Sequence, residues 1–539
     1  MIKEYKKELT RSSINLILIT TLTSILIAVV EFIGPFLIKN FIGNYKTYTT
    51  IFVPLTIIGC TYLLCYIFKI ALNRIINFYS VKFKTEETCK LYNLMFKMKY
   101  SKLNTLEPTY LVEKITNSVN VLFSLYSEAI ATIIIAIFTI IGCVLSMIFI
   151  NKIIALIFLL VIPLQYFSYK KLNKKLSNMC IGLQTTCAKN FMNIISITSK
   201  VDYIKQSYDA TKITKILKTH VKNIHKANSK VNNFAGLVSI SLLDIINNIS
   251  SGIYVYASIN VLLNSMDFSE FVFVNLIISL FFPALNKIIR ANINLRDLEG
   301  IYNFVQKEIL ENLEEDGLIE VNNIAKIEYH VQNLSYDDLS LIENGELIAV
   351  PGDIILIKGQ SGCGKTTLMK GLVKFFNINN IKINDIPISD YTNASIRNKI
   401  SFFSQNIPVI PGSIKDNILM CNNDKVETLE LLKTKPFMQK FFANSDGLDA
   451  KILENGSNLS GGDKQKIALT RIYFENPDVI ILDEITSSID KESAEVIIED
   501  IIKTHNGKII FMISHDDHVK KYCNKVFQIK DKKLLEVIS

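Results

Sequence analysis

The chain has 539 residues, of which 49% are hydrophobic, with a formal net charge of +9 and a mean hydropathy of +0.29. This length predicts more than one domain, and the mean hydropathy is too apolar for an ordinary soluble enzyme. The apolar excess lies before residue 300, and the sequence has no basic patch interleaved with aromatic residues. Lysines near anionic lipid therefore explain the positive charge better than nucleic-acid binding does.

Six apolar stretches are long enough to cross a bilayer, which takes about 20 residues. They cover approximately residues 14–38, 51–72, 129–150, 153–169, 234–263 and 268–289. The fourth is the shortest, and we expect it to follow the third through a tight turn at Asn151 and Lys152. The first lacks a convincing cleavage site and precedes further spans, so a removable signal peptide is not expected. Residues 1–300 are therefore predicted to form an all-α transmembrane domain with cytoplasmic helical extensions.

The distribution of basic residues predicts the orientation of these spans. The N-terminus, the two long loops after the second and fourth stretches and the segment after the sixth are rich in Lys and Arg. The loops on the other side hold little beyond Lys39, Lys46 and Lys152. The positive-inside rule therefore places both termini and both long loops in the cytoplasm.

Charged and amide side chains interrupt the apolar stretches. A charge at the bilayer centre costs about 2.5–3.5 kcal/mol, so Glu31 and Asp244 are not expected to face lipid. In the fifth and sixth stretches, polar residues recur at helical spacing and form two stripes. The stripes are Ser241, Asp244, Asn248 and Ser251, and Asn275, Ser279 and Asn286. We expect them to line a water-accessible substrate cavity. The alternatives are hydrogen bonding between helices and, for Glu31, a position near the outer interface beside Lys39.

The charged segment 301–320 is expected to link the membrane domain to a second domain, residues 321–539. In this domain, an apolar run typical of a buried parallel strand precedes a glycine-rich loop, and a helix is predicted after it. The loop has the form GxxxxGK[ST], in which backbone N–H groups surround phosphate oxygens, the lysine supplies a charge and the hydroxyl reaches Mg²⁺. The predicted ATP-binding residues here are Gly359, Gln360, Ser361, Gly362, Cys363, Gly364, Lys365, Thr366 and Thr367.

Further motifs follow this loop in order. Gln405 comes after one apolar run, and His515 comes after another. Between them, residues 459–463 read Leu-Ser-Gly-Gly-Asp, the apolar run 479–482 ends in Asp483 and Glu484, and Asp490 ends a Ser-Ser-Ile-Asp segment. In the content and order of these motifs, the segment from about residue 327 to residue 539 resembles the ABC ATPases.

The resemblance implies a catalytic role for several of these side chains. Lys365 would bind the β- and γ-phosphates, Glu484 would polarise the attacking water, and His515 would contact the γ-phosphate. The implied Mg²⁺ ligands are Thr366, Gln405 and Asp483. Since phosphoryl transfer to water depends mainly on positioning and charge neutralisation, this set is sufficient for ATP hydrolysis.

The resemblance also implies residues that contact nucleotide from outside the loop. Tyr336 stands where the family places the aromatic ring that stacks on adenine. Its rival, Tyr329, is expected to point into a β-sheet core. The residues of the signature sequence, Ser460, Gly461 and Gly462, would contact nucleotide held by a second copy of the chain.

Two positions depart from the family pattern, and a third position carries a reactive thiol. Asp463 stands where Gln is common, and its carboxylate could weaken ATP affinity; the alternative is an acid that faces away in the first turn of a helix, where a negative charge is favourable. Asn455 stands where Arg is common. Cys363 lies at a helix N-terminus beside Lys365, a setting that makes a thiol reactive.

Taken together, the sequence resembles an exporter-type ABC half-transporter, in which six long transmembrane helices are fused to one α/β P-loop ATPase domain. The tips of the long inner loops, near residues 107–110 and 206–209, would contact the ATPase. The implied assembly is a homodimer in a bacterial plasma membrane that uses ATP and Mg²⁺ to export a small amphipathic molecule, a lipid or a peptide. The polar stripes predict a mildly acidic cavity suited to cationic or amphipathic cargo.

Several alternatives remain open from the sequence. They are a heterodimer with a related half-transporter, an importer with the exporter-type fold, and an ATP-gated membrane switch. An N-terminal peptidase domain is not evident, so a peptide-cleaving exporter is not expected. The nine cysteines show neither metal-ligand spacing nor a paired framework, so neither zinc nor a disulfide is implied.

Overall fold

The computed structural model describes residues 11–44, 52–106, 108–206, 210–336, 339–376, 378, 380–404, 408–420, 429–443, 446–453, 456–484, 489–515 and 517–537. The chain divides into two compact units. The first comprises Met1–Met98 and Thr105–Leu313, and the second comprises Lys99–Asn104 and Glu314–Ser539. The division after Leu313 falls within the segment 301–320 that the sequence predicts as a linker.

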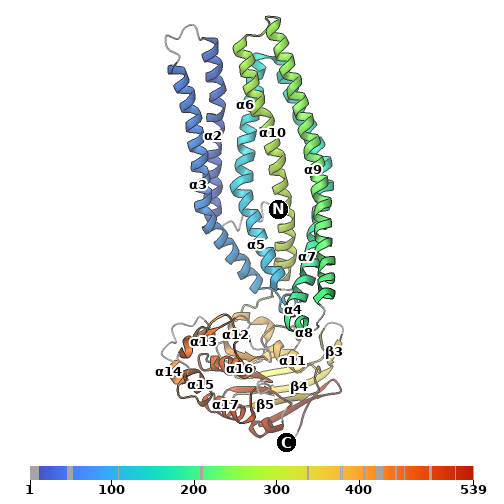
Figure 1. The fold of residues 1–539 in the computed structure, drawn as a ribbon. Helices are drawn as coiled ribbons and strands as arrows, with labels where there is room; N and C mark the ends of the chain where they lie inside the picture. The colour runs from blue at the N-terminus through green and yellow to red at the C-terminus, as the bar shows by residue number, and fades with distance from the viewer. Residues whose placement is uncertain are drawn as a thin grey trace. The chain divides into compact units, whose positions relative to one another are not determined.

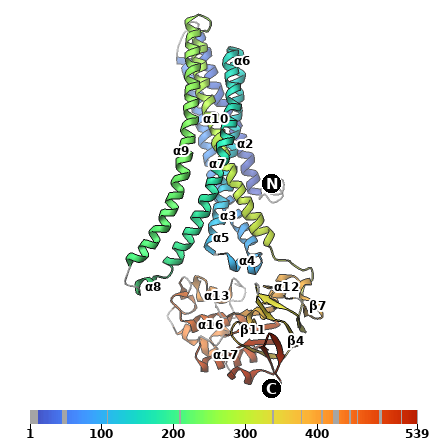
Figure 2. The same cartoon turned by 90° about the vertical axis from the view of Figure 1, so that its right-hand side faces the viewer.

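The first unit is helical, and Figures 1 and 2 show it from two sides. Its α-helices are α2 (Arg11–Gly43), α3 (Phe52–Phe96), α5 (Pro108–Ser124), α6 (Ile130–Ile150), α7 (Lys152–Thr198), α8 (Val201–Gln206), α9 (Ala210–Leu262) and α10 (Phe268–Asn303). The π-helical turns η2 (Leu125–Ala129) and η3 (Phe304–Ile309) and the 3₁₀ turn η4 (Leu310–Asn312) complete it.

Each of the six apolar stretches lies mainly on one helix of this unit: α2, α3, α6, α7, α9 and α10. Within the described residues, four helical segments are long and apolar enough to cross a membrane: Ile14–Gly43, Phe52–Phe96, Tyr110–Ile150 and Phe268–Ile288. Lys152–Phe167 is a shorter apolar helical segment. The turn expected at Asn151 is present, because α6 ends there and the Asn151 side chain accepts hydrogen bonds from the N–H groups of Ile153 and Ile154, capping α7.

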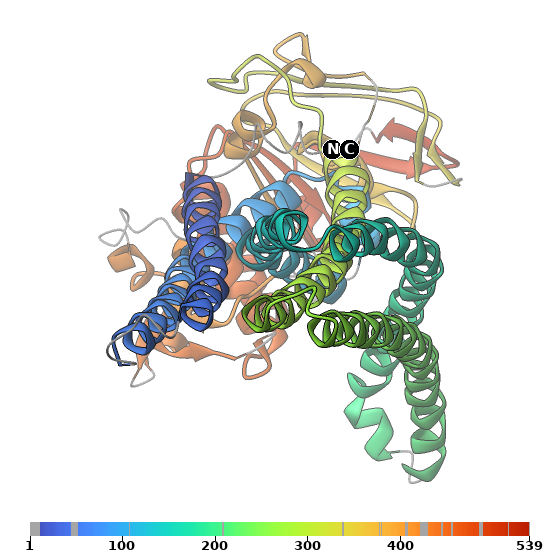
Figure 3. The same ribbon diagram turned by 90° about the horizontal axis from the view of Figure 1, so that it is seen from above.

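Several helices extend far beyond the length that a bilayer requires. Helix α9 has 53 residues and α7 has 47, which at 1.5 Å per residue is roughly 70–80 Å, against a hydrocarbon core of about 30 Å. Helix α2 packs on α3 and α6, α10 packs on α6, and α7 packs on α9. Within this unit, the α7–α9 pair lies apart from the α2–α3 pair, with α6 and α10 between them (Figures 1 and 3).

The second unit is organised around a ten-stranded sheet in the order β7-β6-β1-β4-β14-β13-β5-β12-β11-β8. The strands are β1 (Ile327–Val331), β4 (Asn344–Ala349), β5 (Ile354–Gly359), β6 (Ile381–Ile383), β7 (Ile386–Pro387), β8 (Ile400–Phe403), β11 (Val479–Asp483), β12 (Ile509–Ile513), β13 (Lys525–Lys530) and β14 (Lys533–Glu536). Strands β13, β5, β12, β11 and β8 pair in parallel, which brings their carboxyl ends to one edge. Two small sheets pair β2 (Leu334–Tyr336) with β3 (Leu339–Ile342) and β9 (Gly412–Ser413) with β10 (Lys451–Ile452).

Short helices accompany these strands. They are α4 (Tyr100–Thr105), α11 (Lys365–Leu372), α12 (Asn393–Lys399), α13 (Ile414–Leu419), α14 (Leu429–Leu432), α15 (Gln439–Phe442), α16 (Gly461–Thr470) and α17 (Lys491–Thr504), with 3₁₀ turns at Ile388–Asp390, Pro436–Met438, Gly447–Asp449, Arg471–Tyr473 and Asp517–Tyr522. Strand β5 shows why the sheet has a core on each face. Ile355 and Ile357 belong to one buried cluster and Leu356 belongs to the other, because alternate side chains of a strand point to opposite faces.

Candidate nucleotide site

The glycine-rich loop joins the end of β5 to the start of α11, as the sequence predicts. Gly362 and Gly364 have φ values of 81° and 102°, a left-handed backbone that residues with a Cβ rarely adopt. A Cβ on Gly364 would also lie 3.1 Å from the Cβ of Leu341. The loop therefore depends on glycine at this position both for its backbone conformation and for its close packing.

Lys365 is buried, and its ammonium group is held inside the loop. Its Nζ donates hydrogen bonds to the carbonyl oxygens of Gly359 at 2.9 Å and Gln360 at 3.0 Å. It also lies 3.3 Å from Nε2 of His515. The parallel order β5-β12-β11 explains this meeting, since Lys365 and His515 follow the carboxyl ends of neighbouring strands. A positive charge fixed within a ring of backbone N–H groups is suited to phosphate oxygens.

Thr366 and Asp483 meet across the same edge of the sheet. The Thr366 hydroxyl donates to Oδ2 of Asp483 at 2.8 Å, and Asp483 is 2% exposed. Burial raises the pKa of Asp483 above its ordinary value, although the Thr366 hydrogen bond acts in the opposite direction. A hydroxyl and a buried carboxylate whose charge lacks solvation fit Mg²⁺, a cation that prefers oxygen ligands.

Glu484 and His515 lie in contact directly beside Lys365. Nε2 of His515 lies 3.2 Å from Oε1 of Glu484. Glu484 has a φ of 50°, which is uncommon for a residue with a Cβ and is typical of functional positions. Its N–H donates to the carbonyl of Ile513, so the strained turn between strand ends is fixed by the sheet itself. The same imidazole nitrogen can accept a hydrogen bond from Lys365 or, when protonated, donate one to Glu484.

The signature turn begins α16. Ser460 is the N-cap, and its hydroxyl accepts a hydrogen bond from the N–H of Asp463, which leaves exposed Gly461 at the helix N-terminus. The carboxylate of Asp463 is not free. Its oxygens accept hydrogen bonds from Nζ of Lys440 at 3.0 and 2.9 Å. Although burial acts to raise it, the hydrogen bonds from Ser460 and Lys440 lower the pKa of Asp463 below its ordinary value.

Other predicted residues have different outcomes. Tyr336 forms part of β2, whereas the rival Tyr329 is fully buried and its hydroxyl donates to the carbonyl of Leu368. The prediction that Tyr329 points into the sheet core is therefore confirmed. Gln405, the Ser-Ser pair before Asp490 and the Glu-Asn pair at residues 454 and 455 lie outside the described residues, as do residues 107 and 207–209 of the predicted loop tips.

The residues of the two predicted polar stripes differ in their exposure and surroundings. Asp244, Asn248 and Ser251 are exposed on α9. On α10, Asn275 is half-buried and its Oδ1 has no hydrogen-bond partner among the described residues. Ser279 lines an open cavity whose other residues come from α2, α3 and α10.

The charged residues of α2 pair differently from the expected alternative. Glu31 forms an ion pair with Lys69 at 3.2 Å, and Lys39 pairs with Glu270 at 3.7 Å. The alternative that placed Glu31 beside Lys39 is wrong, because eight residues of helix separate them by roughly 12 Å. Lys69 and Lys440 are the residues that the sequence analysis missed. The position of Lys69 within the apolar stretch 51–72 could have indicated a functional charge. No local signal indicated that Lys440 pairs with Asp463.

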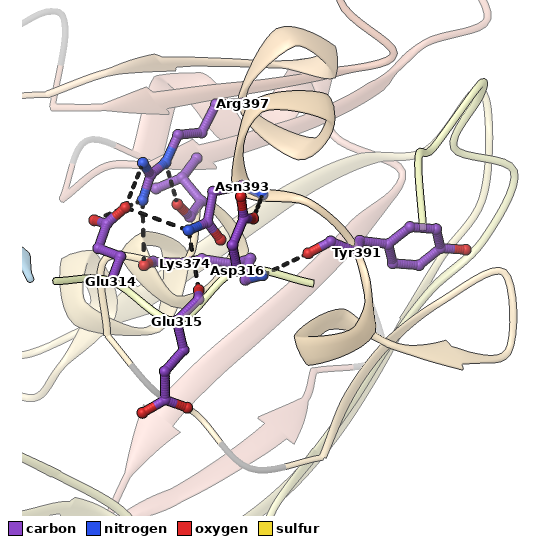
Figure 4. Close-up of polar contacts among 8 residues, drawn as sticks. Glu314, Glu315, Asp316, Lys374, Tyr391, Asn393 and Arg397 are labelled. Carbon is purple, nitrogen blue, oxygen red and sulfur yellow. Dashed lines mark hydrogen bonds and ion pairs between the residues drawn. The ribbon is translucent and has the colours of Figure 1, made fainter. Parts of the chain in front are cut away.

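A cluster of polar contacts fixes the start of the second unit (Figure 4). Arg397 donates from its two terminal nitrogens to Oε2 of Glu314 at 2.8 Å and Oε1 at 2.9 Å, a bidentate arrangement. The Asn393 N–H donates to Asp316 at 2.6 Å. Arg397 also lies over the ring of Phe375, which stacks on Tyr100 with centroids 4.6 Å apart. These contacts hold the segment 314–316 and Tyr100 on the α11–α12 region of this unit.

Comparison with known proteins agrees with this combination of units. The family model described as "ABC transporter transmembrane region" matches residues 17–285, and the model described as "ABC transporter" matches residues 342–487. A probable ABC transporter ATP-binding/permease protein of Haemophilus influenzae is 27% identical over 220 residues, which is 40% of each chain. The sublancin-168-processing and transport ATP-binding protein SunT of Bacillus subtilis is 24% identical over 97% of this chain and 75% of its own.

The fold also matches a solved structure, a bacterial Atm1-family ABC exporter with ATP bound. The TM-score is 0.86, with 15% identity over 97% of this chain and 96% of that one. A helical membrane region followed by a P-loop ATPase domain defines the class of ATP-binding/permease proteins. This chain belongs to the ABC transporters, with the membrane region and the ATPase domain fused in one polypeptide, and its fold is that of the Atm1-family exporter.

Proposed function

We propose that two copies of this chain form an ATP-driven exporter that moves a small amphipathic molecule, a lipid or a peptide across a bacterial plasma membrane. One observation carries this proposal. The chain holds a formed phosphate loop with Lys365 and a separate signature turn capped by Ser460, and both belong to a protein with a membrane region. In a dimer, the loop of one copy and the signature turn of the other can close on each nucleotide, so a homodimer provides two complete sites.

The chemistry follows from the residues at the strand ends. Lys365 binds the phosphate chain of ATP, and Glu484 orients and polarises the attacking water beside it. His515, within 3.3 Å of both Lys365 and Glu484, fixes the two groups relative to each other and contacts the terminal phosphate. Thr366, Asp483 and Gln405 would hold Mg²⁺, which neutralises phosphate charge when it is bound. Tyr336 would stack on adenine.

The distribution of basic residues supports a transporter driven by cytoplasmic ATP. Basic residues flank the spans on the side of both termini, so the ATPase domain lies in the cytoplasm, where ATP is available. ATP binding would draw two ATPase domains together, and the helical extensions, far longer than the bilayer, would transmit this closure to the spans. Hydrolysis would separate the domains again and restore the starting arrangement.

The first test measures ATP turnover by the purified full-length chain in lipid nanodiscs. Glu484→Gln should lower the hydrolysis rate by about 10²–10⁴-fold, the usual contribution of general-base assistance, while ATP binding is retained. The conservative substitution Glu492→Gln, on the exposed start of α17, is the matched control and should hydrolyse ATP at the wild-type rate. Wild-type turnover by Glu484→Gln would remove Glu484 from its proposed role.

The second test measures assembly and direction. Native mass measurement of the chain expressed alone should show a dimer, and a monomer that hydrolyses ATP at full rate would contradict the homodimer. In inside-out vesicles, external ATP should drive accumulation of cargo in the lumen. Depletion from the lumen would indicate import, and ATP turnover that no solute stimulates would favour a membrane switch.

A further inference from the structure

An open cavity of about 340 Å³ lies between α2, α3 and α10 in the membrane unit. Its volume is within the range of small-molecule sites. Each helix contributes residues at helical spacing, so three faces converge on one space. The lining residues are Glu31 and Pro35 of α2, Tyr62, Cys65, Tyr66 and Lys69 of α3, and Leu276, Ser279 and Leu280 of α10.

The cavity contains an ion pair at membrane depth. Glu31 lies roughly 18 Å along α2 from its end at Gly43, and Lys69 lies roughly 26 Å along α3 from its start at Phe52, whereas the hydrocarbon core is about 30 Å thick. The pair is not sealed between helices, because the side chain of Lys69 is 50% exposed and that of Glu31 is 19% exposed. Charges at this depth are costly and typically mark a substrate pathway rather than a stabilising contact.

Two tyrosines extend the polar face of the cavity. Tyr62 and Tyr66 stand one turn apart on α3 and are substantially exposed, at 46% and 64%. Gly34 allows α2 to approach the first ring, since a Cβ there would lie 3.0 Å from the Tyr62 ring. Aromatic faces and a carboxylate attract an ammonium group, and the Lys69 ammonium attracts a phosphate or carboxylate. Leu276 and Leu280 supply an apolar wall.

We propose that this cavity binds the headgroup of a zwitterionic amphiphile, with its ammonium near Glu31 and the two tyrosines and its acidic group near Lys69. The apolar chain of the ligand would lie along α10. This inference rests on the proposed transport function and specifies its substrate class. This cavity differs from the mildly acidic one that the polar stripes predict, because it shares only Ser279 with them and Lys69 balances the charge of Glu31.

Binding can be measured directly, because the chain contains no tryptophan. Tyr66→Trp places a single fluorescent reporter in the cavity. Leu63→Trp is the matched control, because Leu63 lies on the same helix with 62% exposure but is not a lining residue. The full chain is placed in phosphatidylglycerol nanodiscs, which contain no zwitterionic lipid. Three amphiphiles with the same alkyl chain are titrated below micelle formation: an alkylphosphocholine, an alkyltrimethylammonium and an alkyl phosphate.

The zwitterion should shift the emission of Tyr66→Trp saturably, at a concentration about tenfold or more below that of either singly charged amphiphile, since a hydrogen bond to a charged group contributes on this order. Leu63→Trp should show no saturable shift. When Glu31→Gln and Lys69→Gln are both added to the Tyr66→Trp protein, the preference for the zwitterion should be abolished. The exchanged pair, Glu31→Lys with Lys69→Glu, should retain this preference. The control pair Lys39→Gln and Glu270→Gln removes an ion pair outside the cavity and should leave the preference unchanged.

Equal responses to all three amphiphiles, or an unchanged preference in the neutralised pair, would overturn the proposal. The exchanged pair shows whether loss of binding reflects loss of charge or misfolding. ATP turnover is measured in the same discs, so that a failure of the proposed transport function can be distinguished from a failure of the proposed binding site. If the zwitterion binds but does not stimulate turnover, the binding site stands and its role in transport is contradicted. If turnover is stimulated without a saturable Tyr66→Trp signal, transport stands and this cavity is excluded.

Discussion

Nζ of Lys440 lies 2.9 Å from Oδ2 of Asp463 and neutralises the carboxylate at the third residue of α16. This contact explains how a signature turn can carry an acid where related ATPases commonly have an amide. An unpaired carboxylate in the first turn would compete with phosphate for the helix N-terminus. With Lys440 paired to it, the site presents Ser460 and the glycine N–H groups without an opposing charge.

We therefore expect Lys440→Met to raise the KM for ATP several-fold, with a smaller effect on kcat, because the released carboxylate repels phosphate. Asp463→Gln alone should have little effect, and in the double variant it should restore the KM. A double-variant KM as high as that of Lys440→Met would show that Lys440 acts independently of Asp463.

The buried carboxylate of Asp483 should destabilise the folded protein when no cation is bound. Its pKa is raised by burial in the folded protein, so folding favours the protonated form. The free energy of unfolding should fall as pH rises from the ordinary aspartate pKa through the raised value. Asp483→Asn should increase the Tm of the nucleotide-free protein at neutral pH and remove that pH dependence, while abolishing the additional stabilisation by ATP with Mg²⁺. A lower Tm in the nucleotide-free variant would contradict this account.

The bidentate pair between Arg397 and Glu314 should stabilise the ATPase unit. Both side chains are partly buried, so Arg397→Ala should cost about 1–3 kcal/mol. Arg397→Lys should recover only part of the loss, because lysine cannot make the two parallel hydrogen bonds. Thermal unfolding of the full chain measures both variants. Lys433→Ala, which breaks the exposed Lys433–Glu430 pair, is the control and should have almost no effect.

Cys363 should react with a thiol alkylating agent, and saturating ATP should block the reaction. The residue is partly exposed in the loop, between the two left-handed glycines, where a bound phosphate chain would cover it. Mass spectrometry of the labelled peptide identifies the site, and Cys363→Ala is the control. Alkylation at an unchanged rate with saturating ATP would place the thiol outside the nucleotide contact.

The sequence by itself determined the class of the protein. The apolar stretches specify helices through the need to satisfy backbone hydrogen bonds in lipid, and the glycine-rich loop specifies a phosphate site because its backbone conformation requires glycine. These signals are local. Lys365, Thr366 and Ser460 could therefore be assigned from neighbouring residues alone, as could the turn at Asn151.

Only the tertiary structure decided which distant groups meet. The strand order β5-β12-β11 brings Lys365, Glu484 and His515 together, and the separate helix α15 supplies Lys440 to Asp463. Likewise, Glu31 pairs with Lys69 rather than with Lys39 on its own helix. An ion pair depends on the positions of two charges in space, and spacing along the chain does not specify the packing of one element on another.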